Sequence, residues 1–232
     1  MRRVVVLTVF AAAVLALFAA CGDDNDAAAE IDGVDPVALL SEAADRMERA
    51  QSLHFLLEHE NGATEIVRGL RMQRAEGDIV GSDQLNVELR ATAGPLNLEV
   101  GIVIIGDEAW ITNPLTGRWE REQISIEDVF DPATGVTALM RLAADPRVAG
   151  SDTIGGVRTY RVEVTVDSGD VTMFGQPRAG RALRAKVWVG VDDPLVYRIE
   201  IAGSVLAGEP DDLVRRVTFS RFDTEIEIAP PR

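Results

Sequence analysis

Apolar residues recur along the chain with two different spacings, and each spacing predicts a different element. Asp35 and Pro36 suit the N-cap and the first position of a helix. Four apolar residues follow at intervals of three and four: Val37, Leu40, Ala44 and Met47. This interval is typical of a helix with one apolar face. We therefore predict an amphipathic helix of about four turns that ends near Gln51.

From Leu53 onward the period changes to two, which predicts strands with one buried face. The alternation is clearest in residues 53–57, 85–91, 96–104, 160–166 and 183–191. Turn residues separate these segments; Asn61-Gly62, for example, predicts a hairpin whose returning strand carries Ile66, Leu70 and Met72. We count roughly ten strands and no βαβ alternation. The fold class is therefore α+β, with one curved antiparallel sheet.

A second helical segment interrupts the strands between Asp131-Pro132, a helix start, and Asp145-Pro146, a helix stop. Its apolar residues share one face: Val136, Leu139, Met140 and Ala143. Two helices over the concave face of a curved sheet could enclose an apolar cavity for an apolar ligand. From the residue pattern alone, a filled core is the better interpretation.

The N-terminus has the pattern of an export signal. Residues 1–20 combine Arg2 and Arg3 with a long apolar run that ends in Ala19-Ala20, directly before Cys21. The alternatives are a transmembrane anchor, for which the run is short, and an incidental cysteine. We predict a bacterial lipoprotein signal over 1–20, a diacylglycerol anchor on Cys21, an acidic tether over 21–33 and a single domain over 34–232. Acylation would hold the protein at the extracytoplasmic face of the cell membrane.

Composition narrows the function classes. The 232 residues carry a net charge of −15, 5% aromatic residues, one cysteine and two histidines. The acidity disfavours nucleic acid as a partner, and a single cysteine excludes a disulfide within the chain. Removing a signal that contains two arginines and no acid makes the remainder more acidic still.

Motifs of catalysis are missing from the sequence. No metalloprotease, nucleophile-elbow or phosphate-loop motif occurs, and no pair of carboxylates stands out among 38 acidic residues. His54 and His59 lie five apart in a predicted strand, so they should point to opposite faces, and we interpret both as ordinary polar-face residues. We predict no enzymatic activity, no cofactor and no metal.

Several segments in order resemble one protein family, the LppX/LprAFG bacterial lipoproteins, which have a LolA-like fold. These segments are SLHF at 52–55, IGDEAW at 105–110, GRW at 117–119, VFDPATGV at 129–136, IGGV at 154–157 and PLVYRI at 194–199. The resemblance covers about Pro36 to Ile201, and the chain beyond Gly203 matches poorly. Phe18-Ala19-Ala20-Cys21 resembles the lipoprotein box, with Phe in place of Leu.

The resemblance implies a half-barrel sheet capped by helices around an apolar cavity. Family members bind acylated lipid or glycolipid and carry it outward from the cytoplasmic membrane, and no export or transporter partner can be assigned. No catalytic residue comes with the family. The expected cavity lining combines one strand, the second helix as a lid and a loop as a rim: Leu96, Leu98, Val100, Ile102, Ile104, Val136, Leu139, Met140, Ala143, Met173 and Phe174. The alternatives are a LolA-like regulatory or sensor module that acts by protein contact without lipid transport, and a hydrolase on the same scaffold.

Overall fold

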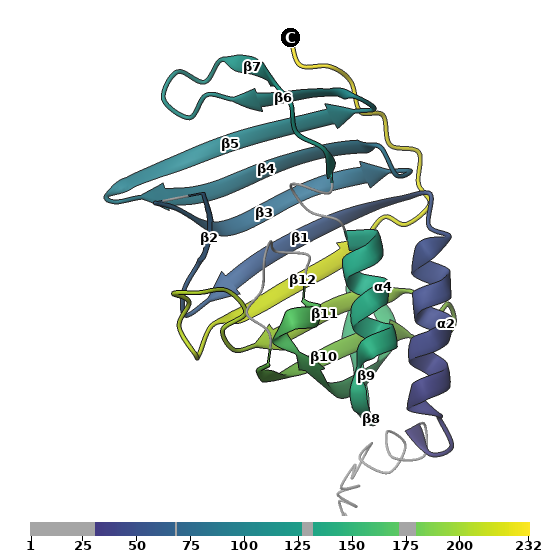
Figure 1. The fold of residues 1–232 in the computed structure, drawn as a ribbon. Helices are drawn as coiled ribbons and strands as arrows, with labels where there is room; N and C mark the ends of the chain where they lie inside the picture. Colours follow the sequence, from purple (N-terminus) through teal and green to yellow (C-terminus); the bar gives the residue numbers. More distant parts are fainter. Residues whose placement is uncertain (1–30, 68, 127–131, 172–179) are drawn as a thin grey trace, which may run out of the picture.

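A computed structural model describes residues 31–67, 69–126, 132–171 and 180–232, and shows one broad sheet with two helices on one of its faces (Figure 1). The helices are α2 (Pro36–Glu48) and α4 (Pro132–Leu142). The strands are β1 (Ser52–Glu60), β2 (Thr64–Val67), β3 (Leu70–Val80), β4 (Gln84–Ala93), β5 (Leu96–Ile105), β6 (Glu108–Thr112), β7 (Trp119–Glu122), β8 (Ala144–Ile154), β9 (Val157–Asp167), β10 (Ala182–Gly190), β11 (Val196–Ala202) and β12 (Val214–Ser220). A short 3₁₀ turn, η1 (Ser168–Asp170), follows β9.

The sheet has 12 antiparallel strands in the order β7-β6-β5-β4-β3-β1-β12-β11-β10-β9-β8, with β2 paired to β3. Consecutive strands form two meanders, and β1 joins them at the centre by pairing with both β3 and β12. The sheet does not close, because β7 and β8 remain its end strands. Helices α2 and α4 lie side by side over the half that contains β8 to β12, and the other meander extends beyond them (Figure 1). This arrangement confirms the predicted fold class.

Helix α2 begins where the sequence predicts. The Asp35 side chain accepts hydrogen bonds from the backbone N–H groups of Val37 (2.9 Å) and Ala38 (3.3 Å), so it caps the first turn. The helix ends at Glu48, earlier than expected. Val37 is 62% exposed and does not belong to the buried face, whose residues are Leu39, Leu40, Ala43, Ala44 and Met47. The apolar spacing therefore located the helix but assigned its first turn to the wrong face.

Two strands were not predicted, and one predicted hairpin is wrong. Strand β7 is four residues long, and β8 contains Pro146 and two register shifts, so neither has a clear period of two. Asn61 takes a positive φ of 62° next to Gly62, but the chain does not turn back on β1 there. Instead β1 pairs with β3, and β2 continues along the same side of β3. Ile66 is 39% exposed as a result.

The predicted signal over 1–20, Cys21 and most of the tether lie outside the described residues, as do Met173 and Phe174. Within the described part of the chain, no helix is both long enough and apolar enough to cross a membrane. The anchoring and rim predictions therefore stay predictions.

Candidate functional site

The concave face of the sheet is apolar across its central strands. Alternate residues of each strand point to this face, and cross-strand register places their side chains in continuous rows. One row contains Phe219, Phe55, Gly77, Val87 and Ile102, on β12, β1, β3, β4 and β5. Gly77 fits where no side chain could, because a Cβ there would come within 2.1 Å of the Asn86 carbonyl oxygen.

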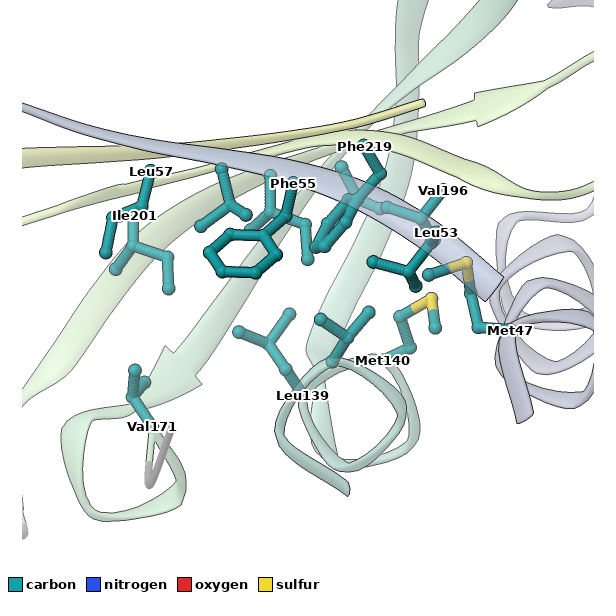
Figure 2. Packing of buried hydrophobic residues seen from close by; sticks show 14 of the residues in the cluster. Met47, Leu53, Phe55, Leu57, Leu139, Met140, Val171, Val196, Ile201 and Phe219 are labelled. Carbon is teal, nitrogen blue, oxygen red and sulfur yellow. The ribbon is translucent and has the colours of Figure 1, made fainter. Parts of the chain in front are cut away.

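Helix α4 supplies the facing layer. Val136, Leu139 and Met140 are 0%, 1% and 3% exposed. Figure 2 shows Leu139 and Met140 directed toward Phe55 and Leu53 of β1, with Phe219 of β12 beside them. These side chains are all no more than 7% exposed, so the structure closes the interior at this point. A ligand in this position would have to displace α4 or the side chains that it contributes.

Charged side chains hold α4 against α2 at the surface. Arg141 of α4 donates hydrogen bonds to Glu48 (2.5 Å) and Asp45 (2.9 Å) of α2. The bond to Glu48 is the main reason why the pKa of Arg141 is raised, and the same bond lowers the pKa of Glu48. All three side chains are about half exposed. The two helices therefore share an apolar inner side and a solvent-exposed ionic contact.

The predicted lining residues fall into three groups. Val100, Ile102 and Ile104 of β5 are buried, as are the three residues of α4, and all six belong to one hydrophobic cluster. Figure 2 shows Leu139 and Met140 of α4 directed toward residues of β1 and β12. Leu98 is half-buried, and Ala143 packs on the cluster just beyond the end of α4. Leu96 is 53% exposed, since it directly follows the β4–β5 turn, and it does not belong to the buried cluster.

Several buried residues were missed as part of the site. Leu53, Phe55 and Leu57 of β1 and Val217 and Phe219 of β12 face α4 from the centre of the sheet. Their period of two was visible in the sequence, at least in β1. What the sequence could not supply was the pairing of β1 with β12, which lie more than 150 residues apart.

A polar cluster lies at one end of the concave face. Arg215 of β12 is paired with His59 of β1 and Ile201 of β11, so its side chain points inward, where it is 0% exposed. It forms an ion pair with Glu209, which is 3% exposed and belongs to the segment between β11 and β12. Arg215 also donates to the Thr64 hydroxyl (3.2 Å) and to the Gly203 carbonyl oxygen (3.2 Å).

The remaining contacts complete this cluster. The Thr64 hydroxyl lies 2.9 Å from His59 Nε2 and 3.1 Å from Glu209 Oε1. Burial, together with the Arg215 charge, lowers the pKa of His59 to about 4. Burial alone would raise the pKa of Glu209, but the hydrogen bonds from Arg215 and from backbone N–H groups outweigh it and lower the pKa. His59 is thus not the polar-face residue that the sequence predicts, although it does lie on the opposite face from His54.

His54 has a different environment. Its Nδ1 lies 2.9 Å from Asp78 and its Nε2 lies 3.4 Å from Glu76, on the convex face. Among the described residues, no group of three or more histidine, cysteine or acidic side chains is placed to hold a metal ion. The chemistry of the concave face is therefore apolar contact, with one buried cluster of charges at its end.

Known proteins share this architecture. Residues 35–228 match the family model described as LppX_LprAFG lipoprotein. A protein of Mycobacterium tuberculosis named "Putative phthiocerol dimycocerosate transporter LppX" is 27% identical over 177 residues, which cover 71% of this chain and 72% of that protein. The match to the family model extends to residue 228, well beyond Gly203, so the C-terminal strand β12 lies within the family region, contrary to the sequence-based expectation.

Two solved structures are similar to this fold. LprF from Mycobacterium bovis superposes with a TM-score of 0.67 at 15% identity, covering 84% of this chain and 96% of that one. LppX of Mycobacterium tuberculosis gives a TM-score of 0.60 at 20% identity, covering 84% and 100%.

Proposed function

The chain belongs to the LppX_LprAFG lipoprotein family, and we propose that it binds an acylated lipid or glycolipid against its concave face and carries it outward from the cytoplasmic membrane. The observation that supports this most is the continuous apolar surface of an open sheet, only part of which lies under the described helices α2 and α4 (Figure 1). The name of the mycobacterial relative, a transporter of a lipid, points to the same class of cargo.

The energetics suit a carrier. Each buried CH₂ group gains about 0.8 kcal/mol on leaving water, so an acyl chain prefers an apolar site to water by roughly 10 kcal/mol. A bilayer is equally apolar, so the protein needs only to match the membrane and to open close to it. Anchoring through a lipid on Cys21 would keep it there, with residues 21–33 as the tether.

The proposed acyl-chain site combines the sheet centre with α4. Its walls are Leu53, Phe55, Leu57, Val217 and Phe219 from the sheet, Val136, Leu139 and Met140 from α4, and Val100, Ile102 and Ile104 from the adjoining meander. Because Leu139 and Met140 pack against β1 and β12 in this structure, α4 acts as a lid that lipid displaces. Met173 and Phe174 remain candidates for the rim.

Lipid retention tests the proposal directly. Protein purified from its native membrane should carry acylated lipid that mass spectrometry of an organic extract identifies. Delipidated protein should then take up a fluorescent fatty acid with saturable kinetics. Protein that is folded by circular dichroism, carries no lipid and ignores the fluorescent fatty acid would rule the proposal out.

Two leucines of α4 provide a matched pair for the lid. Leu139 is 1% exposed and points to the sheet, whereas Leu142 is 55% exposed on the same helix. Leu139→Trp should lower fatty-acid uptake severalfold because the indole fills the space that an acyl chain would take. Leu142→Trp should leave uptake unchanged. Equal uptake by both variants would remove α4 from the site.

A further inference from the structure

A charged side chain on the concave face needs an explanation. On the central strands β1, β12 and β11, the side chains that point inward are apolar except for two ionisable ones, Arg215 and His59. Arg215 comes two residues before Val217 and four before Phe219, so it ends the row of side chains that faces α4. Burying a guanidinium is costly, and an ion pair inside a protein recovers that cost only in part. The buried pair is therefore weak evidence that this charge is present for stability.

The group that neutralises Arg215 comes from a loop, not from the sheet. Glu209 lies between β11 and β12, and one of its carboxylate oxygens contacts Arg215 and Thr64. The other accepts hydrogen bonds from the backbone N–H groups of Val205 (2.9 Å) and Leu206 (2.7 Å). Val205 is itself 0% exposed and belongs to the hydrophobic cluster. The loop thus places a carboxylate beside an apolar side chain, as a lipid with an anionic headgroup places its charge beside an acyl chain.

From this juxtaposition we propose that Arg215 and Thr64 form a binding site for the anionic headgroup of the bound lipid, and that Glu209 occupies this site when lipid is absent. The inference rests on the proposed function, since it assigns the headgroup end of the same site. Arg215 can accept a phosphate or carboxylate through two parallel N–H donors, and the Thr64 hydroxyl adds a third. The acyl chains would run from there along β12 toward Phe219 and α4.

The proposed binding groups lie on strands, whereas Glu209 lies on the loop between β11 and β12. Arg215 and Thr64 lie on strands β12 and β2, so they stay in place when the loop moves. The loop contains Gly203 and Gly208, with φ values of +119° and +85°, a region that other residues rarely adopt. Exchange of the Glu209 carboxylate for a lipid anion leaves the charge of Arg215 compensated in both states. The protein would therefore prefer acidic lipids to neutral lipids with the same chains.

The preference can be measured with vesicles. Delipidated protein is incubated with phosphatidylcholine vesicles that contain a minor fraction of fluorescent phosphatidylglycerol, or of fluorescent phosphatidylcholine with identical chains, and the lipid retained by the protein is counted after separation. Wild-type protein should retain the anionic lipid severalfold more. Inorganic phosphate is added as a competitor to test whether a free anion can replace the lipid headgroup. A site that also binds the acyl chains should retain its lipid in the presence of phosphate.

Two substitutions and one control localise the preference. Glu209→Gln should raise retention of the anionic lipid severalfold, because Arg215 then lacks its internal partner. Arg215→Met should reduce the ratio of anionic to neutral lipid toward one. Since either change leaves a buried charge unpaired, the double variant Glu209→Gln/Arg215→Met is made as well, and it should fold and show a ratio near one. Arg216→Met is the matched control: it removes the neighbouring arginine on the opposite face and should keep the wild-type ratio.

The outcomes separate this inference from the proposed function. Retention of both lipids in equal amounts by wild-type protein would overturn the anion site and leave lipid binding intact. Retention of neither lipid would overturn both. If the double variant keeps the wild-type ratio of anionic to neutral lipid, the headgroup binds away from Arg215. The same conclusion follows if only Arg216→Met reduces this ratio to one.

Discussion

The two faces of the sheet are made of alternate residues of the same strands, yet they are held together in opposite ways. The concave face is a continuous apolar layer. The convex face carries one cross-strand row of charges that spans nine strands: Arg147, Glu163, Lys186, Glu200, Arg216, Glu58, Arg74, Arg90 and Glu99. Most neighbours in this row form ion pairs, for example Lys186 with Glu200 and Glu58 with Arg74, at 3.1 and 2.7 Å.

This difference explains how the strands that carry the charged row can expose their convex face to water. Charges of opposite sign on neighbouring strands satisfy one another in water, so the convex face needs no second layer. Such exposed pairs contribute little to stability, whereas each large side chain buried on the concave face contributes several kcal/mol. Unfolding stability should therefore depend on the concave face, and the convex face should mainly maintain solubility.

The sharpest test compares two neighbours on β1. Phe55 is 2% exposed on the concave face, and Leu56 is half-buried on the convex face. Phe55→Ala should lower the free energy of unfolding by about 3–5 kcal/mol, because it leaves a cavity in the core. Leu56→Ala should lower it by about 1 kcal/mol or less. Urea denaturation followed by circular dichroism measures both, and similar losses would mean that the two faces do not differ as described.

A second test uses the two histidines of β1, one on each face. Burial lowers the pKa of His59 from 6.5 to about 4 in the folded protein. Between these pH values the unfolded chain binds a proton that the folded chain does not, so stability should fall as the pH decreases from about 6.5 to about 4. The contribution is up to about 3 kcal/mol and is fully present above pH 6.5.

Substituting each histidine in turn shows which of them causes this pH dependence of stability. His59→Gln should flatten the pH dependence of the urea midpoint over this range. His54→Gln, on the convex face, leaves the His59 contribution in place and serves as the control. A wild-type midpoint that is constant between pH 6.5 and pH 4 would contradict the lowered pKa of the half-buried His59.

The alternation of residues was enough to predict the faces of individual strands, but not their partners. Leu85, Val87 and Leu89 are buried as the pattern predicts, and the intervening Asn86 and Glu88 are exposed. The pairing of β1 with β3 instead of β2 depends on contacts across the whole core, which a local turn signal at Asn61-Gly62 cannot report. Register between distant strands is set by the buried rows as a group.

The same reason explains what was missed in the site. Arg215 and Glu209 come from a segment, EPDDLVRR at 209–216, in which three acidic residues precede two adjacent arginines, and nothing local indicates that one arginine faces inward. Arg215 and Arg216 are adjacent, and only the register with His59 and Ile201 determines which one is buried. The helix α4, in contrast, was predictable because its apolar spacing is local.

A third and smaller effect concerns the convex row itself. Arg216 is 27% exposed and bonds to Glu60 and Glu200 at 2.7 and 3.1 Å. Arg216→Met should lower the free energy of unfolding by about 1 kcal/mol, and the loss should shrink at high salt. Arg90, 68% exposed and 3.5 Å from Glu99, should show almost no effect when changed to Met. Equal losses at both positions would indicate that the row acts as a cooperative unit.

The smallest effect on stability should occur at the ionic contact between α4 and α2, where it can still change function. Arg141 is 46% exposed, and its bonds to Glu48 and Asp45 are open to solvent, so Arg141→Gln should leave the urea midpoint nearly unchanged. The same substitution should accelerate fatty-acid uptake severalfold, because α4 loses a restraint that it must break to admit a chain. Stopped-flow fluorescence measures the rate, and wild-type protein should approach the rate of the variant as salt screens the contact. A rate that neither the substitution nor salt alters would mean that lipid enters without movement of α4, through the part of the sheet that the helices leave uncovered.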